Sequence, residues 1–208
     1  MTIITLPLTL PIKDQVFGTR DFNQTFANGD TGASQVKVGA PPRYTCSLVS
    51  EERIPDARMY AMWRALVHDL NGQVNQLAVF DLLHPVPRGS ARGGWMAAAT
   101  APAGATTITI DMGAAQAGKT LLQGDWFGVN QAGKNRELLH VQADAVANAA
   151  GVIAVRFAPA LRASVAAMST MAWERPTCLM RRTTAQSSWT SQANTQGGFS
   201  LDLMESWE

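Results

Sequence analysis

The stretch from Thr100 to Pro176 constrains the fold most, because short apolar runs alternate there with turn-forming residues. Its clearest part reads LLQGDWFGVN, then ELLHVQADAV, then GVIAVRFAPALRASVA. Apolar runs broken by Gly, Asn and Asp are typical of antiparallel strands joined by tight turns. We therefore expect residues 95–176 to form a small β-barrel or β-sandwich domain. This domain would be inserted between two halves of another domain, residues 1–90 and 177–208.

The segments outside the insert predict a mainly β domain with one prominent α-helix. Between Asp56 and Asn71, apolar residues recur every three or four positions, as in an amphipathic helix. Asp56 favours the start of this helix through the helix dipole, and Asn71 with Gly72 favours its end. The apolar face consists of Tyr60, Trp63, Leu66, Val67 and Leu70.

Short strands are expected along the rest of the chain. Pro41 and Pro42 separate two strand candidates, because proline cannot donate a ladder hydrogen bond. Residues 28–32 and 113–120 read as loops, residues 184–198 as a polar loop, and residues 84–90 and 93–94 as linkers into the insert. The expected strands span residues 2–10, 35–38, 43–49, 77–83, 107–111, 121–129, 137–143, 151–157, 178–183 and 199–204.

The composition argues against several classes of function. Of the 208 residues, 46% are apolar and only 16% are charged, and the net charge is +1 with no Lys/Arg run. Without a basic patch, we expect no sequence-specific nucleic-acid binding. No apolar run approaches the roughly 18 residues that cross a bilayer, so we expect no membrane insertion. The N-terminus lacks the basic start of a signal peptide, which predicts a protein that is cytosolic at synthesis.

One segment matches the phosphate-binding loop pattern G-x-x-x-x-G-K-[ST], namely Gly113 to Thr120. That motif binds nucleotides only when it opens a helix, whose amide groups and dipole hold the phosphates. Here Gly124 and Asp125 follow too soon for a helix to form. We interpret the match as accidental. A nucleotide hydrolase that uses this loop is kept as a third possible function, after the two described below.

No other catalytic, cofactor or metal site is expected. His68, His84 and His140 have no metal-ligand spacing with one another or with the two cysteines. Cys46 and Cys178 read as buried thiols, although a disulfide between them stays open. The indole rings of Trp126 and Trp173 are expected in the core rather than on a sugar.

The order of these segments resembles a known family. The order is N-terminal strands, an aromatic-faced helix, the strand LAVFDLLHP, an inserted barrel and the closing strand FSLDLMESWE. This layout resembles the distal tail proteins of long-tailed, non-contractile bacteriophages. The inserted stretch, from LLQGDWFGVN to MAWERPTCLMRRT, is similar to tail-tip proteins of such phages.

The resemblance implies a structural virion protein without enzymatic activity or cofactor. Its β-sandwich and helix would assemble into a homo-oligomeric ring, expected to be a hexamer, at the tip of the tail. The ring would be built in the host cytoplasm and join the tail tube to hub or fibre proteins around the genome channel. The alternative is a carbohydrate- or receptor-binding tail accessory module, in which Trp126 or Trp173 is exposed on the insert.

Overall fold

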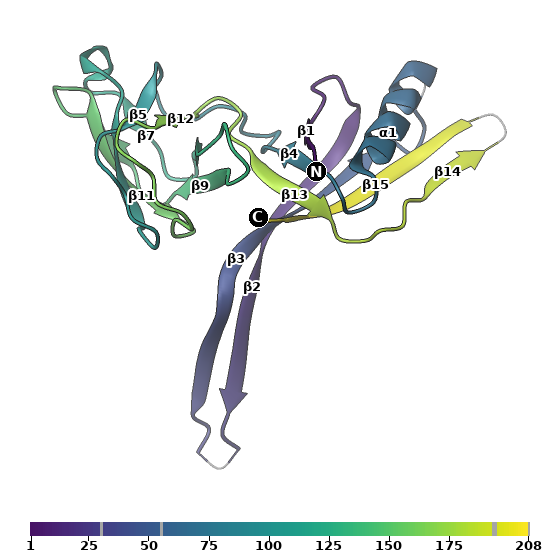
Figure 1. The fold of residues 1–208 in the computed structure, drawn as a ribbon, viewed down its shortest axis with the longest axis horizontal. Coiled ribbons are helices and arrows are strands. Elements are labelled where there is room, and N and C mark those ends of the chain that lie inside the picture. The colour runs from purple at the N-terminus through teal and green to yellow at the C-terminus, as the bar shows by residue number, and fades with distance from the viewer. Residues whose placement is uncertain (30, 55, 193–194, 208) are drawn as a thin grey trace. The chain divides into compact units, whose positions relative to one another are not determined.

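The computed structural model describes residues 1–29, 31–54, 56–192 and 195–207. Over these residues the chain is mainly β, with one α-helix and a nearly closed, barrel-like sheet (Figure 1). It divides into two compact units: residues 1–9, 74–180 and 207 form the first, and residues 10–73 and 181–206 form the second. The predicted domains, residues 1–90 with 177–208 and residues 95–176, stay a prediction.

The barrel-like sheet of the first unit contains six strands in the order β12-β5-β6-β11-β9-β8. An antiparallel bridge between Gly128 of β8 and Ala172, directly after β12, almost closes it. Both backbone hydrogen bonds of this bridge form, at 2.8 and 2.9 Å. The strands are β5 (Trp95–Ala97), β6 (Thr107–Asp111), β8 (Trp126–Val129), β9 (Glu137–Val141), β11 (Val152–Ala158) and β12 (Thr170–Met171).

The core of this sheet follows the alternation in the sequence. In β11, Ile153, Val155 and Phe157 are buried, while Ala154 and Arg156 are exposed. A strand with one buried face has this period of two. The ring of Phe157 meets that of Phe127 edge to face, with centroids 5.7 Å apart. Further core residues are Trp95, Ile110, Leu121, Val129, Leu139, Val141 and Val165.

A turn splits the strand that was expected at residues 121–129. Gly124 adopts a φ of 93°, and the amide of Asp125 donates to Leu122 O at 3.0 Å. The two parts are β7 (Thr120–Leu121), which pairs with β10 (Ala145–Val146), and β8. The expected loop at residues 113–120 contains a short 3₁₀ helix, η1 (Ala114–Gln116).

Three further strands belong to the first unit. β1 (Ile3–Thr5) pairs in parallel with β4 (Gln76–Val79), which pairs antiparallel with β13 (Cys178–Arg182) over residues 178–180. All four residues of β4 are buried: Leu77, Ala78 and Val79, which belong to the apolar run, and the polar Gln76. β4 ends earlier than predicted, because Asp81 Oδ1 accepts from the amide of Leu83 and turns the chain toward solvent.

The second unit contains the predicted helix, α1 (Ala57–Leu70). The carboxylate of Asp56 caps it by accepting from the amide of Arg58 at 2.8 Å. At the other end Asn71 adopts the left-handed conformation, and its amide donates to His68 O. The predicted face at Trp63, Leu66, Val67 and Leu70 is buried. Pro55, which precedes Asp56 and is of a residue type suited to the first turn of a helix, lies outside the described residues.

The strands of the second unit are β2 (Ile12–Ala27), β3 (Ser34–Ser50), β14 (Trp189–Gln192) and β15 (Thr195–Glu205). β15 pairs with β14 and with β3, and β3 pairs with β2, all antiparallel. Helix α1 packs on β15 through aromatic side chains. The ring of Phe199 stacks on that of Trp63 with centroids 5.6 Å apart, and Tyr60 lies 5.2 Å away.

Two predictions for this unit were wrong. The two strands expected at residues 35–38 and 43–49 are one strand, β3, because Pro41 and Pro42 occupy an irregularity in the pairing with β2 where no ladder hydrogen bond is needed. The polar loop expected at residues 184–198 contains β14 and the start of β15. Trp189 of β14 packs against β15, because the centroid of its ring lies 6.1 Å from that of Phe199.

Candidate functional site

The most exposed structure of the second unit is the outer half of the β2–β3 hairpin, which we call the distal arm (residues 23–29 and 31–39). Every described residue of the distal arm is exposed. β15 pairs with β3 only between residues 45 and 49, so the distal arm is a two-stranded ribbon. Figure 1 shows this ribbon continuing beyond the other elements of its unit.

The distal arm carries apolar side chains on both faces. Val36 and Val38 are 61% and 69% exposed, and they share one face because they are two residues apart in a strand. Phe26 is 56% exposed, and it pairs with Gln35 on the opposite face. A two-stranded ribbon is at best marginally stable in water. The distal arm is therefore a candidate contact surface.

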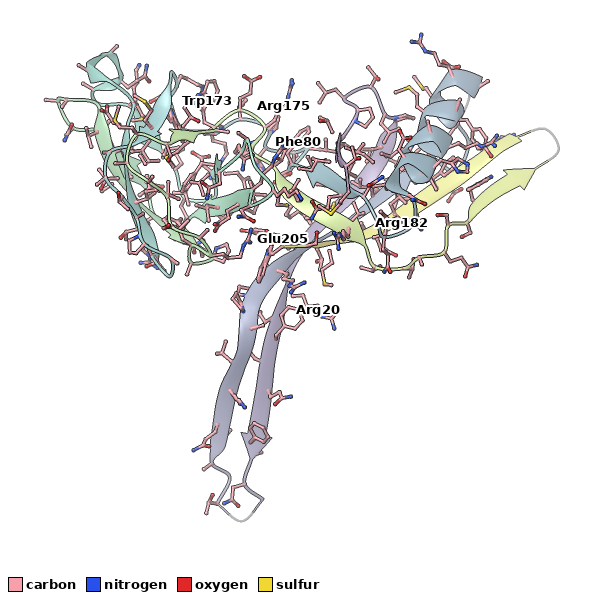
Figure 2. The ribbon with its side chains drawn as sticks, in the orientation of Figure 1. Arg20, Phe80, Trp173, Arg175, Arg182 and Glu205 are labelled. Atoms are coloured by element: carbon pink, nitrogen blue, oxygen red, sulfur yellow. The ribbon has the colours of Figure 1, made fainter. Side chains whose placement is uncertain are left out.

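The base of the distal arm is defined by Phe22. The guanidinium groups of Arg20 and Arg43 lie over its ring at 5.5 and 5.7 Å from the centroid (Arg20 is labelled in Figure 2). Gly39 faces the backbone there, and a Cβ at this position would lie 2.9 Å from Phe22 O. Cation–π contacts and close backbone packing thus fix the point from which the distal arm leaves its sheet.

The barrel of the first unit carries a cavity of about 470 Å³ whose lining includes several polar side chains. One wall is the β8–β9 turn at residues 130–135, and the other comprises residues 163–164 and 169–170. A smaller cavity of about 170 Å³ adjoins it, because both are lined by Asn135 and Ala163. Glu137, Arg162 and Trp207 complete the smaller one.

Buried polar contacts hold both walls of this cavity. The carboxylate of Glu137 is buried and accepts from the amides of Arg162 and Ala163 at 2.8 and 3.1 Å. The Gln131 amide group donates to Thr177 O at 2.9 Å and accepts from Thr177 N at 2.9 Å. These contacts tie each wall to the barrel, so the cavity is preformed.

A second polar cluster surrounds Trp126. Its indole nitrogen donates to Asp81 Oδ2 at 3.0 Å, and the same oxygen lies 3.4 Å from His84 Nδ1. The ring of His140 meets that of Trp126 edge to face, with centroids 4.6 Å apart. His84 and His140, two of the three histidines considered in the sequence analysis, therefore lie in one cluster. Their spacing in the sequence did not indicate this. His68 lies in the other unit, exposed in the last turn of α1.

The electrostatics of this cluster centre on His140. Burial of the imidazole lowers the pKa of His140 below the ordinary value of 6.5, against the opposing effects of Asp125 and Asp81; Arg88 and His84 lower it further. Gln142 Nε2 lies 2.9 Å from His140 Nδ1. Within the described residues, no three His, Cys, Asp or Glu side chains are grouped so that they could bind a metal ion.

The segment Gly113 to Thr120 lacks the geometry of a phosphate-binding loop. Its only helical turn is η1, and Thr120 begins a strand instead of a helix. The amides of Gln116, Ala117 and Lys119 close turns within the segment, and that of Gly118 donates to Ala147 O. Those amides are already hydrogen-bonded within the chain, and no α-helix begins at Thr120 to hold a phosphate at its N-terminus.

Trp173, labelled in Figure 2, is not an open platform for a sugar ring. Its indole nitrogen donates to Gly93 O at 2.7 Å. The Arg92 guanidinium lies over the ring at 5.2 Å, and the Trp95 ring is 6.4 Å away. Trp126 and Trp173 are each partly buried, in contact with the barrel. Cys46 and Cys178 are both buried, and neither forms a disulfide.

Among the residues described, no helix combines the length and the hydrophobicity of a transmembrane segment. The sequence matches no protein-family model and no curated protein.

Proposed function

We propose that this chain is a structural subunit of a homo-oligomeric ring, expected to be a hexamer, at the distal end of a phage tail. The ring would join the tail tube to hub or fibre proteins around the genome channel. The observation that supports this proposal best is the distal arm. All its described residues are exposed, and Phe26, Val36 and Val38 are apolar side chains that water solvates poorly.

The physical argument concerns what such a ribbon needs in order to persist. Each of its strands has an outer edge of backbone amides and carbonyls without a neighbouring strand in the described hairpin. Exposed strand edges pair readily with other chains. A closed ring of identical subunits supplies the same covering surface to every copy, so no arm is left open.

Other features agree with a subunit that neighbours complete. Charged residues make up only 16% of the chain, which is low for a protein whose whole surface faces water. In this proposal the second unit contributes to a β-sandwich ring domain with its helix, and the barrel projects outward. The protein acts in the virion, at the tail tip, after assembly in the host cytoplasm. It has no enzymatic role and needs no cofactor.

Removal of the distal arm tests the proposal. In the variant, residues 24–37 are replaced by Asn-Gly, which closes a two-residue hairpin turn. We expect the full-length protein to sediment as a ring, and the shortened variant to sediment as a folded monomer with the same far-ultraviolet circular dichroism. A shortened variant that assembles like the full-length protein would contradict the role given to the distal arm.

The two alternatives have weaker support. A sugar-binding accessory module that uses Trp126 or Trp173 would need an open indole face, whereas both indole nitrogens are hydrogen-bonded and both rings are partly buried. Glycan binding that is lost in Trp126→Ala would support it. A nucleotide hydrolase at Gly113 to Thr120 would be excluded if ATP and GTP fail to bind, or if binding is unchanged in Lys119→Ala.

A further inference from the structure

The polar cavity of the barrel has the character of a ligand site. Its volume of about 470 Å³ lies within the range of roughly 300–1,000 Å³ that small-molecule sites occupy. The side chains of five lining residues make no hydrogen bond to any described residue, which leaves their polar atoms available to a ligand: Asn130, Asn135, Ser164, Ser169 and Thr170.

The neighbouring residue Gln131 differs from these five, because its side chain is hydrogen-bonded within the protein. Its amide group makes hydrogen bonds to the backbone of Val129, Glu137 and Thr177. Gln131 therefore builds the wall, whereas Asn130 and Asn135 keep their amide groups for the cavity. Carboxamide and hydroxyl groups are both donors and acceptors, as are the hydroxyl groups of a sugar.

The charges around the cavity favour a negatively charged ligand. Lys134 lines the large cavity and Arg162 the adjoining one. Among the described residues that line the two cavities, the one carboxylate is that of Glu137, which is 1% exposed and already accepts two backbone amides. A ligand carboxylate would therefore meet cationic groups rather than an open anion.

The adjoining cavity adds a cation that lies against an aromatic ring. It is lined by the ring of Trp207, and the Arg162 guanidinium lies 4.4 Å from the centroid of that ring. Like Arg92 on Trp173, this cation lies over the indole ring, so what the adjoining cavity contributes is the charge of Arg162, which can pair with an acidic group of a ligand. We propose that the two adjoining cavities form a binding site for an acidic oligosaccharide, with Lys134 and Asn135 as its main polar contacts. This site differs from the sugar platform considered for Trp126 and Trp173, and it does not depend on ring assembly.

Calorimetric titration of the full-length protein tests the site with two oligosaccharides of equal length. The probes are tetragalacturonic acid, which is acidic, and maltotetraose, which is neutral. We expect tighter binding of the acidic probe. Lys134→Gln and Asn135→Ala should each weaken it about tenfold, the loss of one hydrogen bond to a charged group. Both side chains are exposed, so the melting temperature should not change.

Lys119→Gln is the matched control. Lys119 is an exposed lysine of the same unit that does not line either cavity, so its removal changes the net charge equally. We expect it to leave the affinity unchanged. The site would be overturned if neither probe bound, if both probes bound equally, or if Lys119→Gln weakened binding as much as Lys134→Gln. Solution mass is measured separately, so loss of this site would not affect the proposed ring.

Discussion

Asp125 accepts a hydrogen bond from the amide of Gly89, 3.1 Å from its Oδ2 atom, although 36 residues separate the two. The same carboxylate accepts from the amides of Arg88 and Leu122, each at 2.8 Å. Asp125 is buried, and its three backbone donors come from the segment entering the barrel and from the β7–β8 turn. The segment at residues 88–89, which reads as a linker, is therefore bound to the barrel.

The close packing of Gly89 predicts a large effect of a single methyl group. A Cβ at this position would lie 2.2 Å from Thr120 O. We expect Gly89→Ala to lower the free energy of unfolding by about 1–3 kcal/mol, as other overpacked substitutions do, in urea titrations followed by tryptophan fluorescence. Gly94→Ala is the control, because a Cβ there meets no atom within 4 Å. Equal stability of the two variants would contradict the packing described.

Two substitutions of Asp125 compare the loss of the whole carboxylate with the loss of its charge alone. Asp125→Ala leaves three backbone amides without their acceptor, that of Gly89 in a buried position, and we expect a loss of about 2–4 kcal/mol in the free energy of unfolding. Asp125→Asn keeps one carbonyl acceptor and should cost less. Denaturant unfolding measures both. An alanine variant as stable as the parent protein would show that the carboxylate does not hold the segment at residues 88–89.

The histidine at the barrel cluster predicts a dependence of stability on pH. Because the pKa of His140 is lowered by burial, the unfolded chain binds a proton more readily than the folded one. Stability is then fully present above pH 6.5 and falls as the pH drops from 6.5 through the lower folded-state pKa. We expect a melting temperature that falls over this window.

Two variants test whether His140 causes this dependence of the melting temperature on pH. In His140→Gln the fall in melting temperature over this window should be smaller than in the parent protein, because the titrating imidazole is gone. In His68→Gln, which removes an exposed histidine of the other unit, it should persist. Identical pH profiles for His140→Gln and the parent protein would refute the assignment.

Elements set by local chemistry could be predicted from the sequence. The alternation in β11 and the capped helix α1 follow from side-chain periodicity and from Asp56 and Asn71, which act on their own neighbours. The passage of β3 through Pro41 and Pro42 depends on how β2 pairs with it. No local pattern carries that information.

The candidate sites were harder to predict, because distant segments form them. The cavity joins residues 130–135 to residues 163–170. The cluster at Trp126 includes Asp81, 45 residues away. Only the exposed apolar residues of the distal arm left a signal in the sequence: they lie in segments with many polar residues, where no core is expected.

The face of the distal arm that carries Val36 and Val38 should be needed for assembly and not for folding. We expect the double variant Val36→Lys, Val38→Lys to lose ring formation, because buried lysines at a contact surface are costly, while its melting temperature as a monomer is unchanged. Val146→Lys is the control, since Val146 is 64% exposed in the other unit. Sedimentation velocity distinguishes rings from monomers for both variants. Rings formed by the double variant would remove the distal arm from the contact.

The most direct test of the ring is the solution mass of the full-length protein, measured by light scattering on the sample that is then imaged by negative-stain microscopy. We expect a mass that is a whole multiple of the 22.3 kDa chain, and particles that are rings with a central hole. A sample that stays strictly monomeric at high concentration would contradict the proposed ring.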